Sequence, residues 1–337
     1  MAKLSTNYMG LSLKNPLIAG ACNLSMDSDV AKKMEDAGVS AIVFKSLFEE
    51  QINLESFQME EELNEYVERH AEMISLFPTI KHAGPEEHME KLRKLKESLE
   101  IPVIGSLNCV NGDTWSEYAE QMVQTGVDAL ELNFYASPGS YDTSSLELED
   151  EQLQILKDVK EKVNIPVSVK LSPFYTNLLQ LIKRMDDAGV DGFVLFNRLF
   201  QPDIDSSKED HHFPFNLSQP MDYRLPLRFA GLLYKEVKGS ICSNTGIFTA
   251  EDMVKMLLAG ADCVQVVSAI YKHKVPHLST MIKDLEKWMD EKGYSGIGAF
   301  QGKLSKANVK DPYAYQRAQY VDLLMKPFEL LKKYPQV

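Results

Sequence analysis

One lysine stands where a buried strand should carry no charge. The segment Asn164-Ile-Pro-Val-Ser-Val-Lys-Leu-Ser-Pro173 begins with turn residues, continues as a short apolar stretch, and carries Lys170 close to a proline-containing loop. A strand buried on both faces has little reason to hold an ammonium group. Lys170 therefore either reaches solvent or binds an anion, and in a parallel α/β barrel this end of the strand is the functional rim.

Polar residues also end most of the other expected strands. Two small residues, Ala19 and Gly20, end the first strand and would let a flat ligand lie close to the backbone. In chain order, the later strands end in Lys45, Ser46, Asn108, Asn133, Lys170 and Asn197. Any one of these could be polar only because water is there. Together, their amine, hydroxyl and amide groups favour a site for a polar, planar ligand that has both donors and acceptors.

A phosphate site is expected beside the last two strands. Thr249-Ala-Glu-Asp252 is a capping-box pattern that fixes a helix start shortly after Gly246. Free backbone N–H groups and the helix dipole there can bind an anion, as in barrels that hold phosphate after strands seven and eight. The residues expected to contribute are Asn244, Thr245, Gly246, Val267 and Ser268. Flavin mononucleotide (FMN) fits the whole set, with its ring over the barrel mouth and its phosphate between these strands.

A repeated pattern predicts the architecture that would bring these residues together. Four segments read as a helix end, a glycine suited to a left-handed cap, and a short buried strand: 36–44, 124–132, 187–195 and 258–266. Further strands are expected at 16–20, 101–103, 165–167 and 240–244. Helical spacing lies between them, at 29–37, 86–99, 114–125, 150–162, 175–188, 225–237, 249–259 and 276–292. Strands alternating with helices at this length predict a closed (β/α)8 TIM barrel over residues 1–304. An open doubly wound sheet is the alternative, but no G-x-G-x-x-G motif follows the first strand.

Two long loops and a tail are expected outside the barrel. The loops 45–85 and 198–224 both leave carboxyl ends of strands, so they should lie over the functional rim. The second contains Asp203, Asp205, His211 and His212, where a metal is conceivable but a solvated charged surface is favoured. The tail, 305–337, contains an amphipathic helix pattern at 312–334 that could cap the barrel or join a dimer.

Composition excludes several classes of protein. The net charge of −13 argues against general binding to nucleic acid or to anionic membranes. No apolar run approaches the roughly 20 residues that span a bilayer, and residues 1–15 lack a signal-peptide pattern, so we expect a cytoplasmic protein. Cys22, Cys109, Cys242 and Cys263 form no CxxC pair, which favours small core residues over zinc or disulfide chemistry.

The chain resembles the flavin-dependent dihydroorotate dehydrogenases and, secondarily, the pyrimidine-oxidising domain of dihydropyrimidine dehydrogenase. The resemblance runs from Asn15 to about Lys303, and residues 292–303 are close to the cytosolic type. The motifs that carry it are Phe44-Lys-Ser46, Leu130-Glu-Leu-Asn133, Val169-Lys-Leu-Ser-Pro173, Thr245-Gly-Ile247 and Gln265-Val-Val-Ser268. Residues 106–109 and 113–115 look more like the dihydropyrimidine enzyme.

The resemblance implies a reaction and roles for its residues. Dihydroorotate would be oxidised to orotate in pyrimidine biosynthesis by proton abstraction and hydride transfer to flavin N5. Lys45 and Ser46 would contact the flavin near its reactive edge, and Lys45 would also contact the substrate. Asn133 and Asn197 would face flavin and substrate, and Lys170 would lie by the N1–C2 carbonyl region, where an ammonium stabilises the anionic reduced flavin. Ser137, before Pro138, would take the place of the catalytic base.

The sequence leaves the substrate and the reaction class open. The family's substrate-binding Asn after the proline is Gly139 here. Another dihydropyrimidine or a cyclic enone is therefore an alternative substrate. A Schiff-base lyase that uses Lys170 or Lys45 is also compatible with these residues, as is a non-catalytic flavin-binding barrel. The resemblance further implies a homodimer and a soluble electron acceptor, such as fumarate, or a partner reductase.

Overall fold

Eight parallel strands form a closed barrel in the computed structural model. The structure describes residues 2–50, 52, 85–110, 112–134, 141–198, 202–212, 217–311, and single residues 315, 321, 325, 332 and 333. The barrel strands are β3 (Leu17–Ala19), β4 (Ala41–Val43), β6 (Val103–Asn108), β7 (Ala129–Asn133), β8 (Val167–Leu171), β9 (Gly192–Leu195), β12 (Ser240–Asn244) and β13 (Cys263–Val266). They follow one another around the barrel, and the pairing of β4 with β6 closes it. A short strand, β5 (Leu47–Phe48), adds to the edge of β6.

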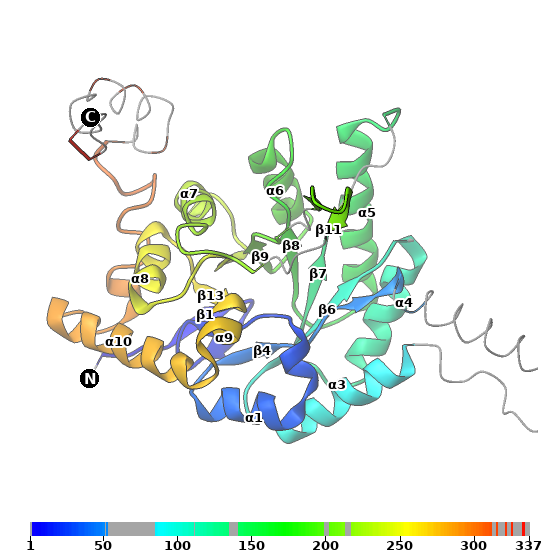
Figure 1. The fold of residues 1–337 in the computed structure, drawn as a ribbon, viewed down its shortest axis with the longest axis horizontal. Coiled ribbons are helices and arrows are strands. Elements are labelled where there is room, and N and C mark those ends of the chain that lie inside the picture. Colours follow the sequence, from blue (N-terminus) through cyan, green and yellow to red (C-terminus); the bar gives the residue numbers. More distant parts are fainter. Residues whose placement is uncertain are drawn as a thin grey trace, which may run out of the picture.

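Helices surround the strands on all sides (Figure 1). They are α1 (Ser28–Asp36), α3 (Glu86–Ser98), α4 (Gly112–Val123), α5 (Ser145–Lys162), α6 (Leu178–Asp187), α7 (Arg224–Leu233), α8 (Ala250–Ala259), α9 (Ser268–His273) and α10 (Pro276–Lys292), with 3-10 turns η1 (Asn23–Met26) and η2 (Ile297–Ala299). Each helix segment expected between the strands is present, with boundaries shifted by a few residues. The (β/α)8 prediction is confirmed.

The repeated pattern works through two local devices. Its glycines, Gly38, Gly126, Gly189 and Gly260, all have positive φ, as the cap prediction requires. The aspartates that follow three of them tie neighbouring strands together. Asp128 Oδ2 accepts from Val103 N at 2.7 Å, and Asp191 Oδ2 accepts from Val167 N at 2.8 Å. These two carboxylates satisfy the first N–H of β6 and of β8, and Asp262 Oδ2 accepts from Ile241 N at 2.7 Å, at the second residue of β12.

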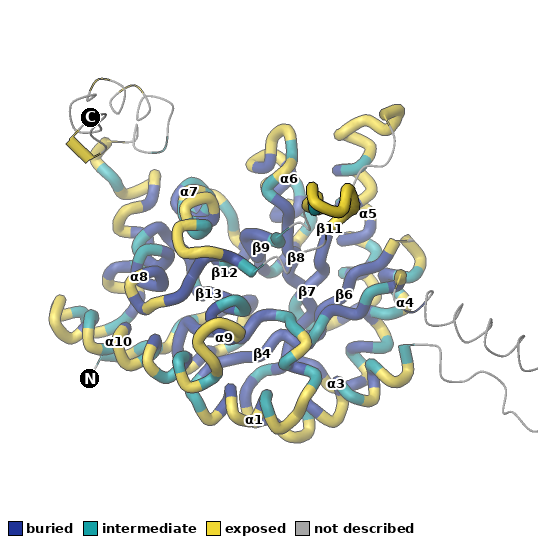
Figure 2. Tube along the Cα trace, in the orientation of Figure 1, coloured by how far each residue is buried: buried dark blue, intermediate teal, exposed yellow. Residues whose placement is uncertain are grey.

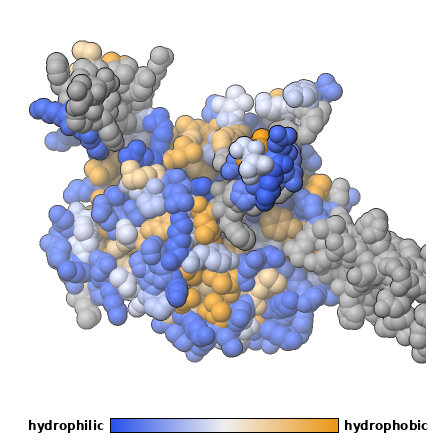
Figure 3. All heavy atoms as spheres, in the orientation of Figure 1, coloured by the Kyte–Doolittle hydropathy of each residue, from blue (hydrophilic) through white to orange (hydrophobic). Residues whose placement is uncertain are grey.

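Two apolar layers hold the barrel. The outer layer lies between strands and helices, and burial is highest along the strands (Figure 2). The inner layer fills the amino-terminal half of the barrel, and its members are Tyr8, Met9, Leu13, Ile18, Ala41, Val43, Ile104, Ala129, Val194, Cys242 and Cys263. Hydrophilic side chains cover much of the described outer surface, with hydrophobic ones toward the centre of the view (Figure 3).

A hairpin that the sequence did not predict closes the bottom of the barrel. Strands β1 (Thr6–Tyr8) and β2 (Leu11–Leu13) pair antiparallel and place Tyr8 and Met9 against the inner layer. A Cβ atom on Gly192 would lie 2.8 Å from Met9 Cγ, so β9 needs glycine where the hairpin packs. A second unpredicted hairpin, β10 (Asp203–Asp205) with β11 (Asp210–His212), lies within the loop 198–224.

Some expectations fall outside the described residues. These are most of the loop 45–85, Ser137 and Gly139, and most of the helix pattern at 312–334. The described start of the tail contacts the barrel, because Lys306 N donates to Gly231 O at 2.8 Å. None of the described helices is long and apolar enough to cross a membrane. Within the described ranges, no group of three His, Cys, Asp or Glu residues is arranged to hold a metal, including at His211 and His212.

Candidate active site at the carboxyl rim

Three asparagines form a connected group at the rim. Asn133 ends β7 directly opposite Lys170 on β8. Its side-chain Oδ1 accepts from Asn197 Nδ2 at 2.8 Å, and its backbone O accepts from Asn108 Nδ2 at 3.0 Å. Because each amide is held by another, the three present donors and acceptors to the barrel mouth in fixed orientations.

Lys170 points into the barrel mouth and does not reach bulk solvent. It is 6% exposed, and its Nζ lies 3.4 Å from Glu131 Oε1. Glu131 also accepts from Gln265 Nε2 at 2.6 Å. Glu131 and Gln265 are both fully buried. An ammonium is therefore held at the rim by a carboxylate deeper inside the barrel.

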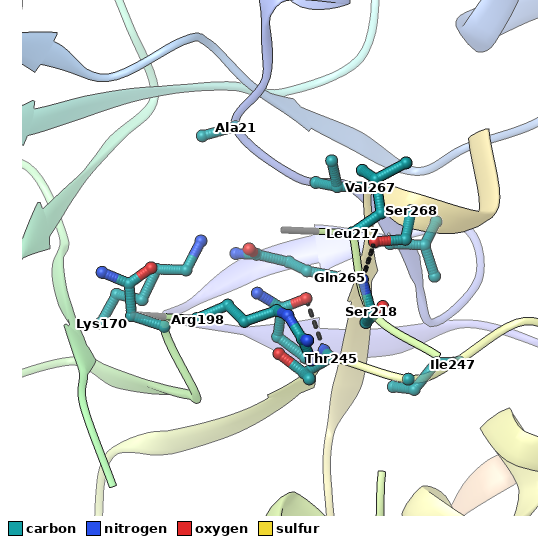
Figure 4. Close-up of a pocket in the computed structure, with 14 residues that line it drawn as sticks. Ala21, Lys170, Arg198, Leu217, Ser218, Thr245, Ile247, Gln265, Val267 and Ser268 are labelled. Atoms are coloured by element: carbon teal, nitrogen blue, oxygen red, sulfur yellow. Dashed lines mark hydrogen bonds between the residues drawn. The ribbon is translucent and has the colours of Figure 1, made fainter. Parts of the chain in front are cut away.

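An open pocket extends from this lysine toward the ends of the last two strands (Figure 4). It contains about 590 Å³ of empty space, part of it continuous with solvent. Lys170 lies at one end, Gln265 lies nearer the middle, and Ile247 and Ser268 lie toward the other end; Asn197 and Gly246 also line the pocket. The remaining lining residues are Ala21, Arg198, Leu217, Ser218, Asn244, Thr245, Val266 and Val267. The shape suits a ligand with a polar ring at one end and an anionic group at the other.

The loop after β9 covers the second end. Ser218 N donates to Ser268 Oγ at 2.8 Å, and Lys272 Nζ donates to Ser218 O at 2.8 Å. Arg198 forms an ion pair with Asp222 in the same loop. The expectation that this loop lies over the rim is confirmed for its described part.

The turn after β12 has a structural reason for its glycine. Thr245 and Gly246 both have positive φ, at 78° and 74°. A Cβ atom on Gly246 would lie 2.4 Å from Tyr223 N, so glycine is needed for packing against the 222–223 backbone. The predicted capping box of α8 is present, and Asp252 Oδ2 accepts from Phe248 N and Thr249 N. Those two N–H groups are therefore used, as is that of Thr245, which donates to Asn244 Oδ1 at 2.7 Å. An anion would meet Gly246, Ile247, Val267 and Ser268.

Lys45 and Ser46 follow β4 at the rim and do not line this pocket. Ser46 Oγ is buried and 2.7 Å from Ser106 Oγ. His88 is near Lys45, and burial, with the charges of Lys45 and Lys91, lowers the pKa of His88 to about 4. The imidazole is thus neutral at pH 7 and adds no charge beside Lys45.

The thiols lie in apolar surroundings. Burial raises the pKa values of Cys22, Cys109 and Cys263 above the ordinary value. All four cysteines are free thiols in the structure. Cys109, Cys242 and Cys263 are buried, as predicted for small core residues, whereas Cys22 is only partly buried.

The predicted site residues fall into four groups. Those that line the pocket are Lys170, Asn197, Asn244, Thr245, Gly246, Val267 and Ser268. Gly20, Lys45, Ser46, Asn108 and Asn133 lie at neighbouring strand ends without lining it. Ala19 packs in the outer apolar layer, so its side chain faces the helices. Ser137 lies outside the described residues.

Sequence reasoning missed Glu131 and Gln265. Glu131 gave the same signal as Lys170, a charged residue inside a buried strand, but it stands before the strand end. Gln265 belongs to the motif Gln265-Val-Val-Ser268, which predicts no contact for its side chain. Their contact joins residues 134 positions apart, which no local pattern reveals.

Comparison with known proteins identifies the family. The family model described as dihydroorotate dehydrogenase matches residues 3–289. The chain belongs to the dihydroorotate dehydrogenase family. The expectation drawn from the motifs is thereby confirmed.

Relatives within this family match most of the chain. It is 28% identical over 314 residues, 90% of this chain and 98% of the relative, to the dihydroorotate dehydrogenase B (NAD(+)) catalytic subunit of Thermoplasma volcanium. It is 28% identical over 311 residues, 88% of this chain and 97% of the relative, to the Thermoplasma acidophilum protein of that name. The corresponding Methanocaldococcus jannaschii protein is 26% identical over 275 residues, 80% of this chain and 87% of the relative.

Proposed function

We propose that this protein is an FMN-dependent oxidoreductase that converts dihydroorotate to orotate in pyrimidine biosynthesis. The observation that carries the proposal is Lys170, a buried ammonium opposite Asn133 at the rim of a barrel of this family. A fixed positive charge in a site shielded from water stabilises negative charge that develops during a reaction.

The residues present fit FMN. Gln265 Oε1 is buried and has no hydrogen-bond partner among the described residues, and Gln265 lines the pocket. A buried acceptor of this kind needs a donor from a bound molecule. Lys170 and Gln265 would hold the ring and its neighbouring hydroxyls, and Gly246, Ile247 and Ser268 would hold the phosphate. FMN supplies the hydride acceptor, N5, which no side chain can provide.

The chain's own groups would bind and orient the substrate. Asn133 and Asn197 offer amide donors and acceptors in orientations fixed by their mutual hydrogen bond. Lys45 adds a positive charge at the same rim, which suits the carboxylate of dihydroorotate. Ser137 is our proposal for the group that removes the substrate proton, and its replacement by Ala should abolish reduction by substrate while FMN remains bound.

The relatives' names suggest where the electrons go. Each is called the catalytic subunit of an NAD(+) enzyme, which implies a further subunit in those proteins. We propose that this chain also passes electrons to a partner polypeptide, with a soluble acceptor such as fumarate as the alternative. A homodimer, a cytoplasmic location, and a division into a barrel (1–304) and a tail (305–337) are parts of the same proposal, and light scattering tests the first.

A Schiff-base lyase is the less supported alternative. A Schiff-base lysine must present a free amine to the substrate, whereas Lys170 Nζ is paired with the buried Glu131 carboxylate at 3.4 Å. A borohydride treatment in the presence of carbonyl substrates should therefore leave Lys170 unmodified.

The visible spectrum of the purified protein tests the proposed function. We expect a bound flavin whose absorption bleaches on anaerobic addition of dihydroorotate. Lys170→Met should slow that bleaching by about 100-fold or more. Lys160→Met is the matched control, because Lys160 forms its ion pair with Asp191 and lies on an outer helix.

Two further results would distinguish the candidate functions. If dihydroorotate does not reduce the bound flavin but dihydrouracil does, the same reaction would be assigned to another dihydropyrimidine. Failure to bind FMN, even when it is added to the purified protein, would refute the proposal.

A further inference from the structure

A buried carboxylate lies beneath the pocket, and neither the sequence motifs nor the proposed reaction gives it a role. Glu131 is on β7, two residues before Asn133, so both side chains point into the barrel and Glu131 lies one layer deeper. It is fully buried. Such a charge is costly to bury unless it is paired and hydrogen-bonded. Glu131 has both kinds of partner, in Lys170 and Gln265.

The carboxylate fixes which way the Gln265 amide faces. An ionised carboxylate only accepts hydrogen bonds, so Gln265 must present its NH2 group to Glu131. The observed 2.6 Å contact from Nε2 to Oε2 is this arrangement. The amide oxygen of Gln265 is then left without a partner in the described structure, and Gln265 is one of the residues that line the pocket.

The same carboxylate holds the lysine. Lys170 Nζ uses one N–H toward Glu131 Oε1, and two remain for other acceptors. Figure 4 shows the ends of Lys170 and Gln265 directed toward one another across the pocket. The floor of the pocket thus presents a donor beside an acceptor, and one carboxylate orients both.

We propose that Glu131 is a positioning residue of the cofactor pocket, which orients Lys170 and Gln265 and offsets the charge of the lysine. The inference rests on the proposed function, because it takes FMN as the molecule in the pocket. The negative charge of Glu131 opposes the effect of Lys170 on an anionic ring. A pocket with this pair should therefore hold the flavin at a lower reduction potential than a pocket with the lysine alone.

Replacement of the charge by its isostere gives the main test. In Glu131→Gln, the positive charge of Lys170 is no longer offset, and negative charge on the flavin is stabilised. At pH 6 we expect a more positive midpoint potential for bound FMN. We also expect binding of sulfite, which leaves negative charge on the flavin ring, to tighten by about tenfold. Neither readout depends on turnover.

Glu149→Gln is the matched control. It removes the same charge from a largely buried glutamate on α5, 3.7 Å from Arg184, away from the pocket. Potential and sulfite affinity should match wild type. An effect of equal size in both variants would mean that overall charge, and not the position of Glu131, is responsible.

Gln265→Met gives a second test that leaves the ion pair intact. It removes the amide, keeps the approximate volume, and leaves Glu131 its ion pair with Lys170. FMN affinity should fall by about five- to tenfold, while sulfite binding to the flavin-loaded protein stays within about twofold of wild type. Gln152→Met, on α5, is its control, since Gln152 bonds to Tyr175 at 2.9 Å away from the pocket lining.

The outcomes separate the two proposals. Wild-type potential and sulfite affinity in a folded Glu131→Gln protein would overturn the role of Glu131, as would unchanged FMN affinity in Gln265→Met. Either result would leave the proposed function standing if dihydroorotate still bleaches the flavin. A wild-type protein that binds no FMN would refute both.

Discussion

The two ends of the barrel interior are built from the same strands but serve different purposes. At the amino-terminal end, Ile104, Ala129 and Val194 pack with the hairpin residues Tyr8 and Met9 into a dry apolar layer. At the carboxyl end, amides and an ammonium surround an open pocket. Along β7, the inward side chains change from apolar to polar within one strand, from Ala129 through Glu131 to Asn133.

The difference shows how the barrel separates stability from chemistry. Inward side chains recur every second residue along a strand, and alternate strands contribute to alternate layers. The apolar layer stabilises the fold through burial, whereas the polar rim needs partners for every buried group. Glu131 and Gln265 mark the boundary, because both are fully buried yet polar. Substitutions above and below this boundary should therefore have separable effects.

The largest expected effect is on the apolar layer. Tyr8→Ala empties the space of a fully buried aromatic ring and should lower the free energy of unfolding by about 3–5 kcal/mol. Urea unfolding measures it. FMN affinity of the folded fraction should stay within about twofold of wild type, because Tyr8 lies in the opposite end of the barrel. A large loss of FMN affinity would show that the two ends are coupled.

FMN bound at the carboxyl end of the barrel should also stabilise the folded protein. FMN at about 100 times its dissociation constant should raise the free energy of unfolding by about 2.7 kcal/mol. If the two ends are independent, Tyr8→Ala should gain the same increment from FMN as wild type. Unfolding curves with and without FMN for both proteins provide the comparison, and unequal increments would contradict it.

Two substitutions at one strand separate the layers most directly. Val194→Ala, inside β9, should cost about 2 kcal/mol of stability and leave flavin reduction unchanged. Asn197→Ala, just beyond β9, loses one hydrogen bond and should cost only about 1 kcal/mol. Its reduction by dihydroorotate should slow by about 10- to 100-fold. Stopped-flow absorbance and urea unfolding on both variants test this pair, and a reversal of the two patterns would refute the division.

Local patterns in the sequence predict helix caps and strand ends better than contacts inside the barrel. The glycine caps, such as Gly38 and Gly260, and the capping box at Thr249 follow from residue types at short spacing, and the structure confirms them. Lys170 could be placed at the rim because it ends a strand. The partnership of Glu131 with Gln265 could not be predicted, because it depends on barrel closure across 134 positions. The β1–β2 hairpin was missed because its strands have three residues each.

The smallest expected effect concerns a single oxygen in the apolar layer. The Tyr8 hydroxyl is buried, and none of the described groups bonds to it with standard geometry. Burial, with a smaller effect of Cys242 and Cys263, raises the pKa of Tyr8 well above its ordinary value, so the ring stays neutral. Removal of an unsatisfied buried hydroxyl should not cost stability, and Tyr8→Phe should be up to about 1 kcal/mol more stable than wild type. Urea unfolding beside Tyr8→Ala provides the measurement. A loss of stability would mean that the hydroxyl has a partner, such as the nearby Ser168, and that the polar character of the upper barrel extends to its base.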